Sequence, residues 1–258
     1  MKNINNKLWS LLLVAILLSA CSKTTTIRHH KDFQNQLSKS KTLTILPATV
    51  EVVSVDASGK TTRNYDYESL VEDVIIDVLR PKLGQMGYKT KFLSRREIHN
   101  NKLSRNVLSF REDYNKKIAE LYNAIEWQEE KAQNVNLFLE KYAKEVAKLA
   151  NSDLVIFVEY HLRAKTSGAC TKDFAVAVLS AALVGAAGSQ DPAELLSIRI
   201  AIINPHNGQF VWSNFARTGF GTFSGAFSKN AQNIETKRLK EIFDTALKAL
   251  PTRDKLNS

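Results

Sequence analysis

The sequence has little of what would identify an enzyme or a disulfide-rich fold. It contains only two cysteines and five histidines, and no two histidines form a metal-binding pair at helical spacing. No serine or cysteine lies in a recognisable nucleophile motif. No apolar run reaches the roughly 20 residues that a membrane-spanning helix needs. What remains is a chain with 44% hydrophobic residues, which is typical of a globular domain with one sizeable core.

The first 21 residues are the most informative part of the chain. Lys2 and Lys7 form a short basic head, and residues 8–18 are apolar apart from Ser10. Small residues follow, in the order Leu-Ser-Ala-Cys, ending at Cys21. A basic head, a short apolar middle and small residues before a cut are the layout of a secretory signal. The sequence therefore predicts a signal peptide over residues 1–20.

A cysteine immediately after Leu-Ser-Ala resembles the lipobox of bacterial lipoproteins. The resemblance implies that Cys21 becomes the first residue of the mature chain and carries acyl chains, each buried CH₂ adding about 0.8 kcal/mol of membrane affinity. The next residue is Ser22 and not aspartate, which in the enterobacterial sorting pattern implies the outer membrane, with the domain facing the periplasm. If Cys21 is acylated, Cys170 has no partner within the chain. Two interpretations of Cys170 stay open, a small buried residue or an intermolecular thiol.

The chain is basic, with a formal net charge of +10, and removing residues 1–20 leaves +8 because Lys2 and Lys7 go with them. Residues 21–41 carry about half of that charge and few apolar side chains, which predicts a flexible basic tether ahead of a single domain at 42–258. The tether is either a solvated linker or a segment attracted to anionic headgroups. Nucleic-acid binding is not expected, because no recognition motif is present.

Within the domain, apolar periodicity predicts strands and helices in the order β-α-β-α-α-β-β-β-α. The expected strands are 42–55, with a bend or a bulge at Pro47, and 88–93, 153–163, 195–203 and 209–218. The expected helices are 67–86, a helical pair over 104–150, and 231–250. Asn207-Gly208 is the strongest short hairpin signal in the chain. We therefore predict an α/β (α+β-like) fold: a mixed sheet of about five strands with flanking helices, a carboxy-terminal β-hairpin, a closing helix and a helical insertion.

The strand at 153–163 is predicted to have one apolar face and one face that becomes charged partway along. Glu159 and His161 lie on the second face and point to the same side. A carboxylate–imidazole pair can serve acid–base chemistry, but such pairs are more often hydrogen-bonded structural groups. We expect no catalytic residue, no cofactor and no metal.

Three stretches together resemble a group of periplasmic lipoproteins. They are 43–47, a strand that ends in proline; 147–156, a helix that feeds a strand through an aspartate; and 198–212, two strands joined by an Asn-Gly turn. The group comprises the curli-secretion lipoprotein, the lipoprotein activators of penicillin-binding proteins, and the amino-terminal domain of the Tol translocation protein. The resemblance covers 42–100 and 135–250 and implies envelope assembly, secretion or cell-wall support. Residues 104–133 look like an insertion beyond it.

Two uncharged segments are candidates for contact with a partner or a membrane. Residues 174–188 are small and apolar throughout, and residues 219–227 are rich in glycine and phenylalanine. The first is either a buried core segment or an exposed one that packs between subunits or touches the bilayer. The second is either folded back on the core or available to a partner. The candidate contact residues are Phe174, Val176, Val178, Leu179, Leu183, Val184, Phe220, Phe223 and Phe227.

The function expected from these features is that of an outer-membrane lipoprotein whose periplasmic domain is a non-catalytic assembly or accessory factor for an envelope complex. Its partners are then the membrane, through the lipid, and envelope proteins that the sequence does not identify. The alternative is a subunit of an oligomeric secretion channel or an envelope-spanning secretion machine. Whether copies of the chain associate with one another stays open.

Overall fold

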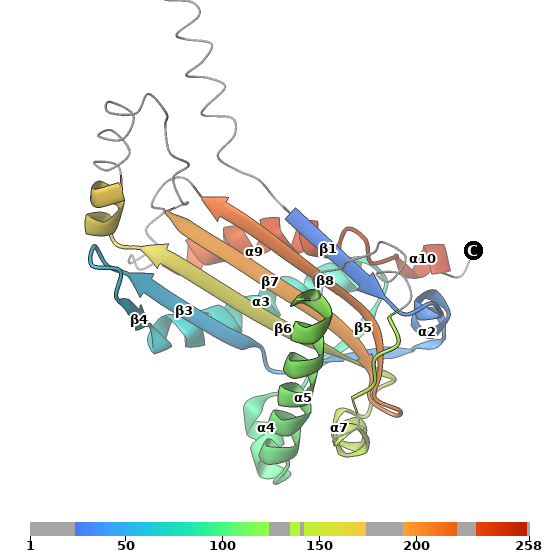
Figure 1. The fold of residues 1–258 in the computed structure, drawn as a ribbon. Coiled ribbons are helices and arrows are strands. Elements are labelled where there is room, and N and C mark those ends of the chain that lie inside the picture. The colour runs from blue at the N-terminus through green and yellow to red at the C-terminus, as the bar shows by residue number, and fades with distance from the viewer. Residues whose placement is uncertain (1–23, 124–134, 140–141, 174–192, 221–230, 257–258) are drawn as a thin grey trace, which may run out of the picture.

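The computed structural model describes residues 24–123, 135–139, 142–173, 193–220 and 231–256. These residues form a mixed sheet of eight strands flanked by helices (Figure 1). The predicted fold class is confirmed, although the sheet has more strands than the five expected. The strands are β1 (Thr24–His29), β2 (Thr42–Ile45), β3 (Thr49–Val55), β4 (Thr61–Arg63), β5 (Lys89–Phe92), β6 (Leu154–Lys165), β7 (Glu194–Asn204) and β8 (Gln209–Phe220). The helices include α2 (Phe33–Lys39), α3 (Tyr65–Gln85), α4 (Arg95–Asn100), α5 (Ser104–Asn123), α7 (Ala143–Ala150), α9 (Ala231–Leu247) and α10 (Arg253–Leu256).

Three long antiparallel strands, β6, β7 and β8, form the middle of the sheet. The predicted hairpin is confirmed: β7 and β8 are joined by a turn at 205–208. Gly208 has a φ of +73°, and a Cβ at this position would meet the carbonyl oxygen of Leu139 at 1.9 Å. Only glycine therefore fits at this position. The Leu139 amide donates to the carbonyl of Gly208 at 2.8 Å, so the turn also holds the segment that precedes α7.

The predicted strand at 42–55 is two strands, β2 and β3, which both run parallel to β6. The strand is interrupted around Pro47, because proline has no amide hydrogen to donate to a sheet. Arg111 donates to the carbonyl of Pro47, and Arg95 donates to the carbonyl of Ala48 at 3.0 Å. Burial, followed by the neighbouring charge of Arg95, lowers the pKa of Arg111 to about 10. Two arginines therefore satisfy backbone groups that the sheet leaves unpaired at the break.

The prediction of a flexible tether over 21–41 is wrong for the residues that the structure describes. Residues 24–29 form the edge strand β1, which pairs with β8 along its whole length, and 33–39 form α2. Leu37 is fully buried, and Arg253 donates to the carbonyls of Leu37, Ser38 and Ser40 at the end of α2. Backbone pairing with β8 and a few buried groups therefore hold residues 24–40 against the domain, although their composition is typical of a linker.

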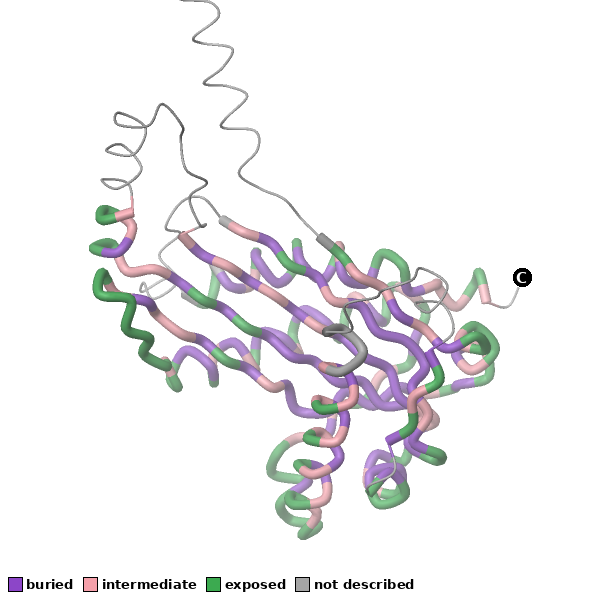
Figure 2. The backbone as a smooth tube through the Cα atoms, in the orientation of Figure 1, coloured by how far each residue is buried: buried purple, intermediate pink, exposed green. Residues whose placement is uncertain are grey.

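Two helices, α3 and α9, cover one face of the sheet and enclose the larger core (Figures 1 and 2). The alternating residues of β6 that were predicted to be apolar on one face all belong to this core: Leu154, Ile156, Val158, Tyr160 and Leu162. Pro81 lies inside α3, which continues past it to Gln85. Proline therefore does not mark the end of this helix.

Among the described elements, α5 covers part of the other face of the sheet. Phe110, Tyr114 and Ile118 of α5 are fully buried against Phe157 of β6, with the Tyr114 and Phe157 rings stacked at 5.0 Å. The helix predicted at 104–133 thus begins as expected, but its apolar side is used in this second core. The second helix of the expected pair is shorter than predicted, because the described residues 135–139 are not helical and α7 starts at Ala143.

Candidate functional site

The two ends of the sheet differ in what they carry. We call the near end the one where β1 begins and β8 ends, since Thr24 pairs with Arg217 and Glu194 pairs with Phe220. The far end is the one where β2 begins and where the turn between β7 and β8 lies. Helices α3 and α9 run side by side from the near end, where Tyr67 contacts Glu235, to the far end, where Lys82 contacts Asp244.

A buried carboxylate, Glu235 of α9, lies at the near end within the larger core. It is fully buried and accepts hydrogen bonds from Tyr67 of α3, at 2.8 Å, and from Tyr160 of β6. Burial, followed by the charge of Glu235, raises the pKa of both tyrosines well above the ordinary value. Both phenols therefore stay protonated and remain donors to the carboxylate across the accessible pH range.

Arg238, one helical turn further along α9, links this group to the start of β7. Its guanidinium donates to Glu235 at 3.3 Å and to Glu194, which is also fully buried. Burial disfavours the charged guanidinium, but the two carboxylates raise the pKa of Arg238 overall. We call Tyr67, Tyr160, Glu194, Glu235 and Arg238 the near-end network. It ties two helices to the two central strands β6 and β7.

The candidate acid–base pair, Glu159 and His161, is not a hydrogen-bonded pair. Glu159 is buried and accepts from Arg199 of β7 at 2.6 Å, whereas His161 is exposed and contacts Glu51 of β3 at 3.0 Å. Each side chain thus bridges to a different neighbouring strand on the second face of the sheet. The predicted placement of both residues on one face is confirmed, and their partners are those of structural cross-strand pairs.

Most of the candidate contact residues lie outside the described residues. These are Phe174, Val176, Val178, Leu179, Leu183, Val184, Phe223 and Phe227, and Cys21 is outside as well; Phe220 is the last residue of β8. The described residues that flank these segments are nevertheless informative. Asp173 forms an ion pair with Lys165 at the end of β6, and β7 begins at Glu194.

These flanks gather at one place in the fold. The chain leaves the end of β6 and returns at the start of β7, and it leaves the end of β8 and returns at the start of α9. All four points, together with the start of β1 three residues after Cys21, lie at the near end. This convergence could not be predicted from the sequence, because it depends on strand register.

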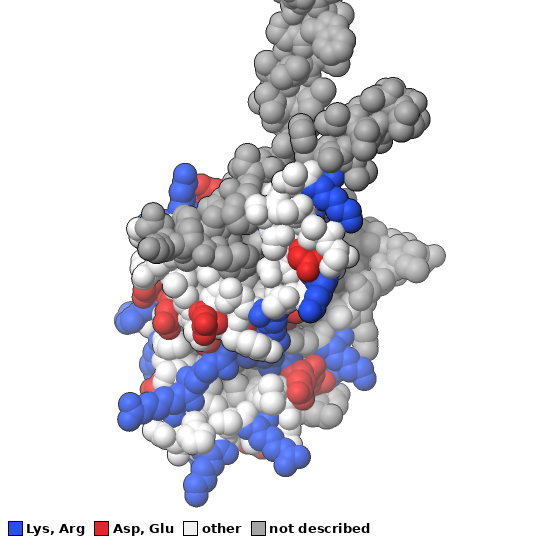
Figure 3. All heavy atoms as spheres, turned by 90° about the vertical axis from the view of Figure 1, so that its left-hand side faces the viewer, with Lys and Arg blue, Asp and Glu red and all other residues white. Residues whose placement is uncertain are grey.

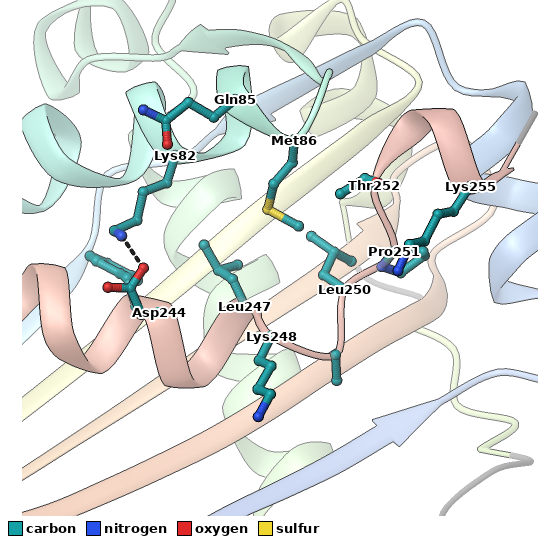
Figure 4. Close-up of a pocket in the computed structure, with 12 residues that line it drawn as sticks. Lys82, Gln85, Met86, Asp244, Leu247, Lys248, Leu250, Pro251, Thr252 and Lys255 are labelled. Atoms are coloured by element: carbon teal, nitrogen blue, oxygen red, sulfur yellow. Dashed lines mark hydrogen bonds and ion pairs between the residues drawn. The ribbon is translucent and has the colours of Figure 1, made fainter.

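The far end carries two hollows lined by lysine. One, of about 460 Å³, lies where α3 and α9 end and the chain turns toward α10 (Figure 4). Its inner wall includes Met86, Leu247 and Leu250, and the ion pair between Lys82 and Asp244 crosses it from one helix to the other (Figure 4). The second, of about 600 Å³, lies between α7 and the start of β2.

The near end has a different surface. Seen from the left of Figure 1, acidic and basic side chains are interspersed over the part of this surface that the structure describes (Figure 3). Among all the residues that the structure describes, no three histidine, cysteine or carboxylate side chains are grouped so that they could hold a metal ion. None of the described helices is both long and apolar enough to span a bilayer.

Sequence comparisons do not place the chain in a family: no protein-family model and no curated protein sequence matches it. Among solved structures, the chain is similar to the PelC dodecamer from Paraburkholderia phytofirmans. The identity is 11%, the alignment covers 86% of this chain and 94% of that one, and the TM-score is 0.37. A single-residue variant of the same PelC dodecamer aligns at 10% identity and a TM-score of 0.32, covering 86% of this chain and 95% of that one. Likeness at this level assigns no function.

Proposed function

We propose that this protein is an outer-membrane lipoprotein, anchored through acyl chains on Cys21, whose periplasmic domain is a non-catalytic assembly or accessory factor for an envelope complex. The feature that carries the proposal is the signal-like leader ending in Leu-Ser-Ala-Cys. The lipid raises the effective concentration of the domain toward partners at the same membrane surface.

The short spacing between Cys21 and β1 supports a specific orientation. Only two residues lie between Cys21 and Thr24, so the three residue steps reach at most about 10 Å even when fully extended. The near end of the sheet is therefore held against the bilayer, and the far end projects into the periplasm.

The two uncharged segments of the sequence fit the same orientation. Residues 174–188 and 219–227 are joined to the fold at the near end, so they leave and re-enter the domain beside the membrane surface. We place the contacts of these segments with the bilayer or with an envelope partner there. Exposed apolar segments at an anchored surface are typical of such contacts.

Replacing Cys21 with serine tests the anchor. The Cys21→Ser chain should move from the membrane fraction to the periplasmic fraction, whereas the matched Cys170→Ser chain should stay with the membrane. Density-gradient fractionation of the unchanged chain should place it with outer-membrane markers. A Cys21→Ser chain that stays with the membrane would contradict the proposal.

Two further outcomes concern the role of the domain. Replacing Glu159 and His161 together with glutamine should leave the in vivo phenotype of the unchanged chain intact, and loss of function without loss of folding would instead support an enzyme. A stable ring of many copies in detergent, seen by mass photometry, would support the secretion-channel alternative.

A further inference from the structure

The far-end hollow between α7 and β2 is built from several elements. Lys144, Ala147 and Lys148 of α7 and its C-cap residue Asn151 line it at helical spacing, and Lys41, Thr42 and His206 contribute from other parts of the chain. At about 600 Å³ the hollow is within the size range of small-ligand sites, which extend from about 300 to 1,000 Å³. It is therefore roomy enough for an anion larger than a single phosphate.

Positive charges outnumber negative charges in the lining of the hollow. Lys41, Lys144 and Lys148 line it, and none of the three forms an ion pair within the described part of the chain. The single acid in the lining is Asp153. Lys144 and Lys148 are four residues apart on one helix, where like charges destabilise the helix by a few tenths of a kcal/mol. An anion bound between them would remove that repulsion.

Three of the groups that could oppose an anion, the Asp153 carboxylate and two backbone carbonyls, already have hydrogen-bond partners. The Asp153 carboxylate accepts from the backbone amides of Lys41, at 2.6 Å, and Thr42, at 3.0 Å. The carbonyls that end α7 are also engaged: Thr44 donates to that of Ala150, and Lys91 donates to that of Asn151. The partial negative charge at this helix end is thus partly offset before any ligand binds.

We propose that this hollow binds a multiply charged phosphate-bearing anion, with Lys41, Lys144 and Lys148 as its cationic contacts. Lysine is a compact, strongly charged group that binds phosphate as a point charge and imposes no fork geometry. Asn151, Thr42 and His206 add further hydrogen-bonding side chains around the same space. Binding here does not require the lipid anchor.

The position of the hollow bears on where the anion comes from. Strand β6 runs from the far end to the near end, and its 12 residues span roughly 40 Å. If Cys21 holds the near end at the bilayer, the headgroups of that same membrane are out of reach of the hollow. The phosphate group then belongs to a dissolved molecule or to a facing surface.

Inorganic pyrophosphate is a suitable probe, titrated by calorimetry into the purified full-length mature protein in detergent at low salt. We expect saturable binding that weakens as salt is added, because the sites are solvent-exposed. Lys144→Gln combined with Lys148→Gln should weaken binding at least about tenfold, or about 1.4 kcal/mol. Arginine at both positions keeps the charge and should retain binding.

The matched control is Lys248→Gln combined with Lys255→Gln, which removes the same charge from the other far-end hollow, shown in Figure 4. This variant should bind pyrophosphate like the unchanged protein. Equal weakening in both double variants, or no saturable binding at all, would overturn the proposal.

A second experiment separates the two sources of the anion. Protein held in phosphatidylcholine nanodiscs is mixed with phosphatidylglycerol vesicles. Capture of vesicles that depends on Lys144 and Lys148 identifies a headgroup, and pyrophosphate binding without capture identifies a dissolved anion.

Discussion

The near and far ends of the sheet use charged residues in opposite ways. At the near end, Glu194, Glu235 and Arg238 are removed from water and bonded to one another and to two tyrosines. At the far end, Lys41, Lys144 and Lys148 surround an open hollow without an ion-pair partner among the described residues. Buried charges that satisfy one another hold elements in place, whereas hydrated charges of one sign are available to a ligand.

The largest expected effect comes from Arg238→Met. This change leaves two buried carboxylates without their shared cation, and breaking a buried pair in this way costs about 3–5 kcal/mol. The matched change at the far end is Lys82→Met, which breaks the exposed pair with Asp244 and should cost at most about 1 kcal/mol. Urea denaturation of both variants measures the difference, and equal losses would contradict the contrast between the two ends.

A smaller effect is expected from Tyr160→Phe, which removes one donor to the buried Glu235 carboxylate. An unsatisfied buried acceptor costs about 1–3 kcal/mol. At the far end Tyr88 donates to the carbonyl of Pro251 at 2.6 Å, and Tyr88→Phe should cost only about 0.5–1.5 kcal/mol because its acceptor is neutral. Chemical denaturation of the two phenylalanine variants, compared side by side, checks the order.

Asp153→Ala should cost about 1 kcal/mol, since the hydrogen bonds that its carboxylate accepts from the amides of Lys41 and Thr42 are largely exposed. Asp153→Asn keeps an acceptor oxygen and should recover part of that loss. Faster hydrogen exchange confined to the Lys41 and Thr42 amides in the alanine variant would localise the effect. Exchange that rises across the whole sheet would contradict it.

A further effect, confined to alkaline pH, is a change in the pH dependence of stability. Burial raises the pKa of Tyr88 to about 12, from 10 in the unfolded chain. The raised value means that the contribution of Tyr88 is intact below pH 10 and is lost as the pH rises to 12, because the unfolded chain releases its proton first. Tyr88→Phe should therefore lose less stability than the unchanged protein over this interval, as measured by denaturation at each pH. An unchanged slope would contradict the assignment.

Periodicity predicted the middle of the sheet well, for a physical reason. The alternating apolar residues of β6 and the Asn-Gly turn before β8 are local signals, and burial on one face enforces them. β1 was missed because an edge strand needs few apolar residues, and its stability comes from pairing with β8, about 190 residues away. A bend or a bulge at Pro47 was expected, but not that the residues before and after it would form two separate strands.

The near-end network could not be predicted from the sequence. Glu194, Glu235 and Arg238 read as surface charges, and they come together only because β7 begins and α9 begins at the same end of the fold. The lysines of the far-end hollow were likewise not singled out, since Lys41 was assigned to a linker and α7 was expected to start earlier. Helical spacing of Lys144 and Lys148 was the one available signal.

The orientation of the domain on the membrane can be measured by fluorescence quenching with brominated lipids. A fluorophore is attached to Arg217→Cys, at the near end, or to His206→Cys, at the far end, in the lipidated protein carrying Cys170→Ser; both positions are exposed. We predict strong quenching at position 217 and little at position 206. Equal quenching at the two positions, or stronger quenching at 206, would contradict an anchor that holds the start of β1 against the bilayer.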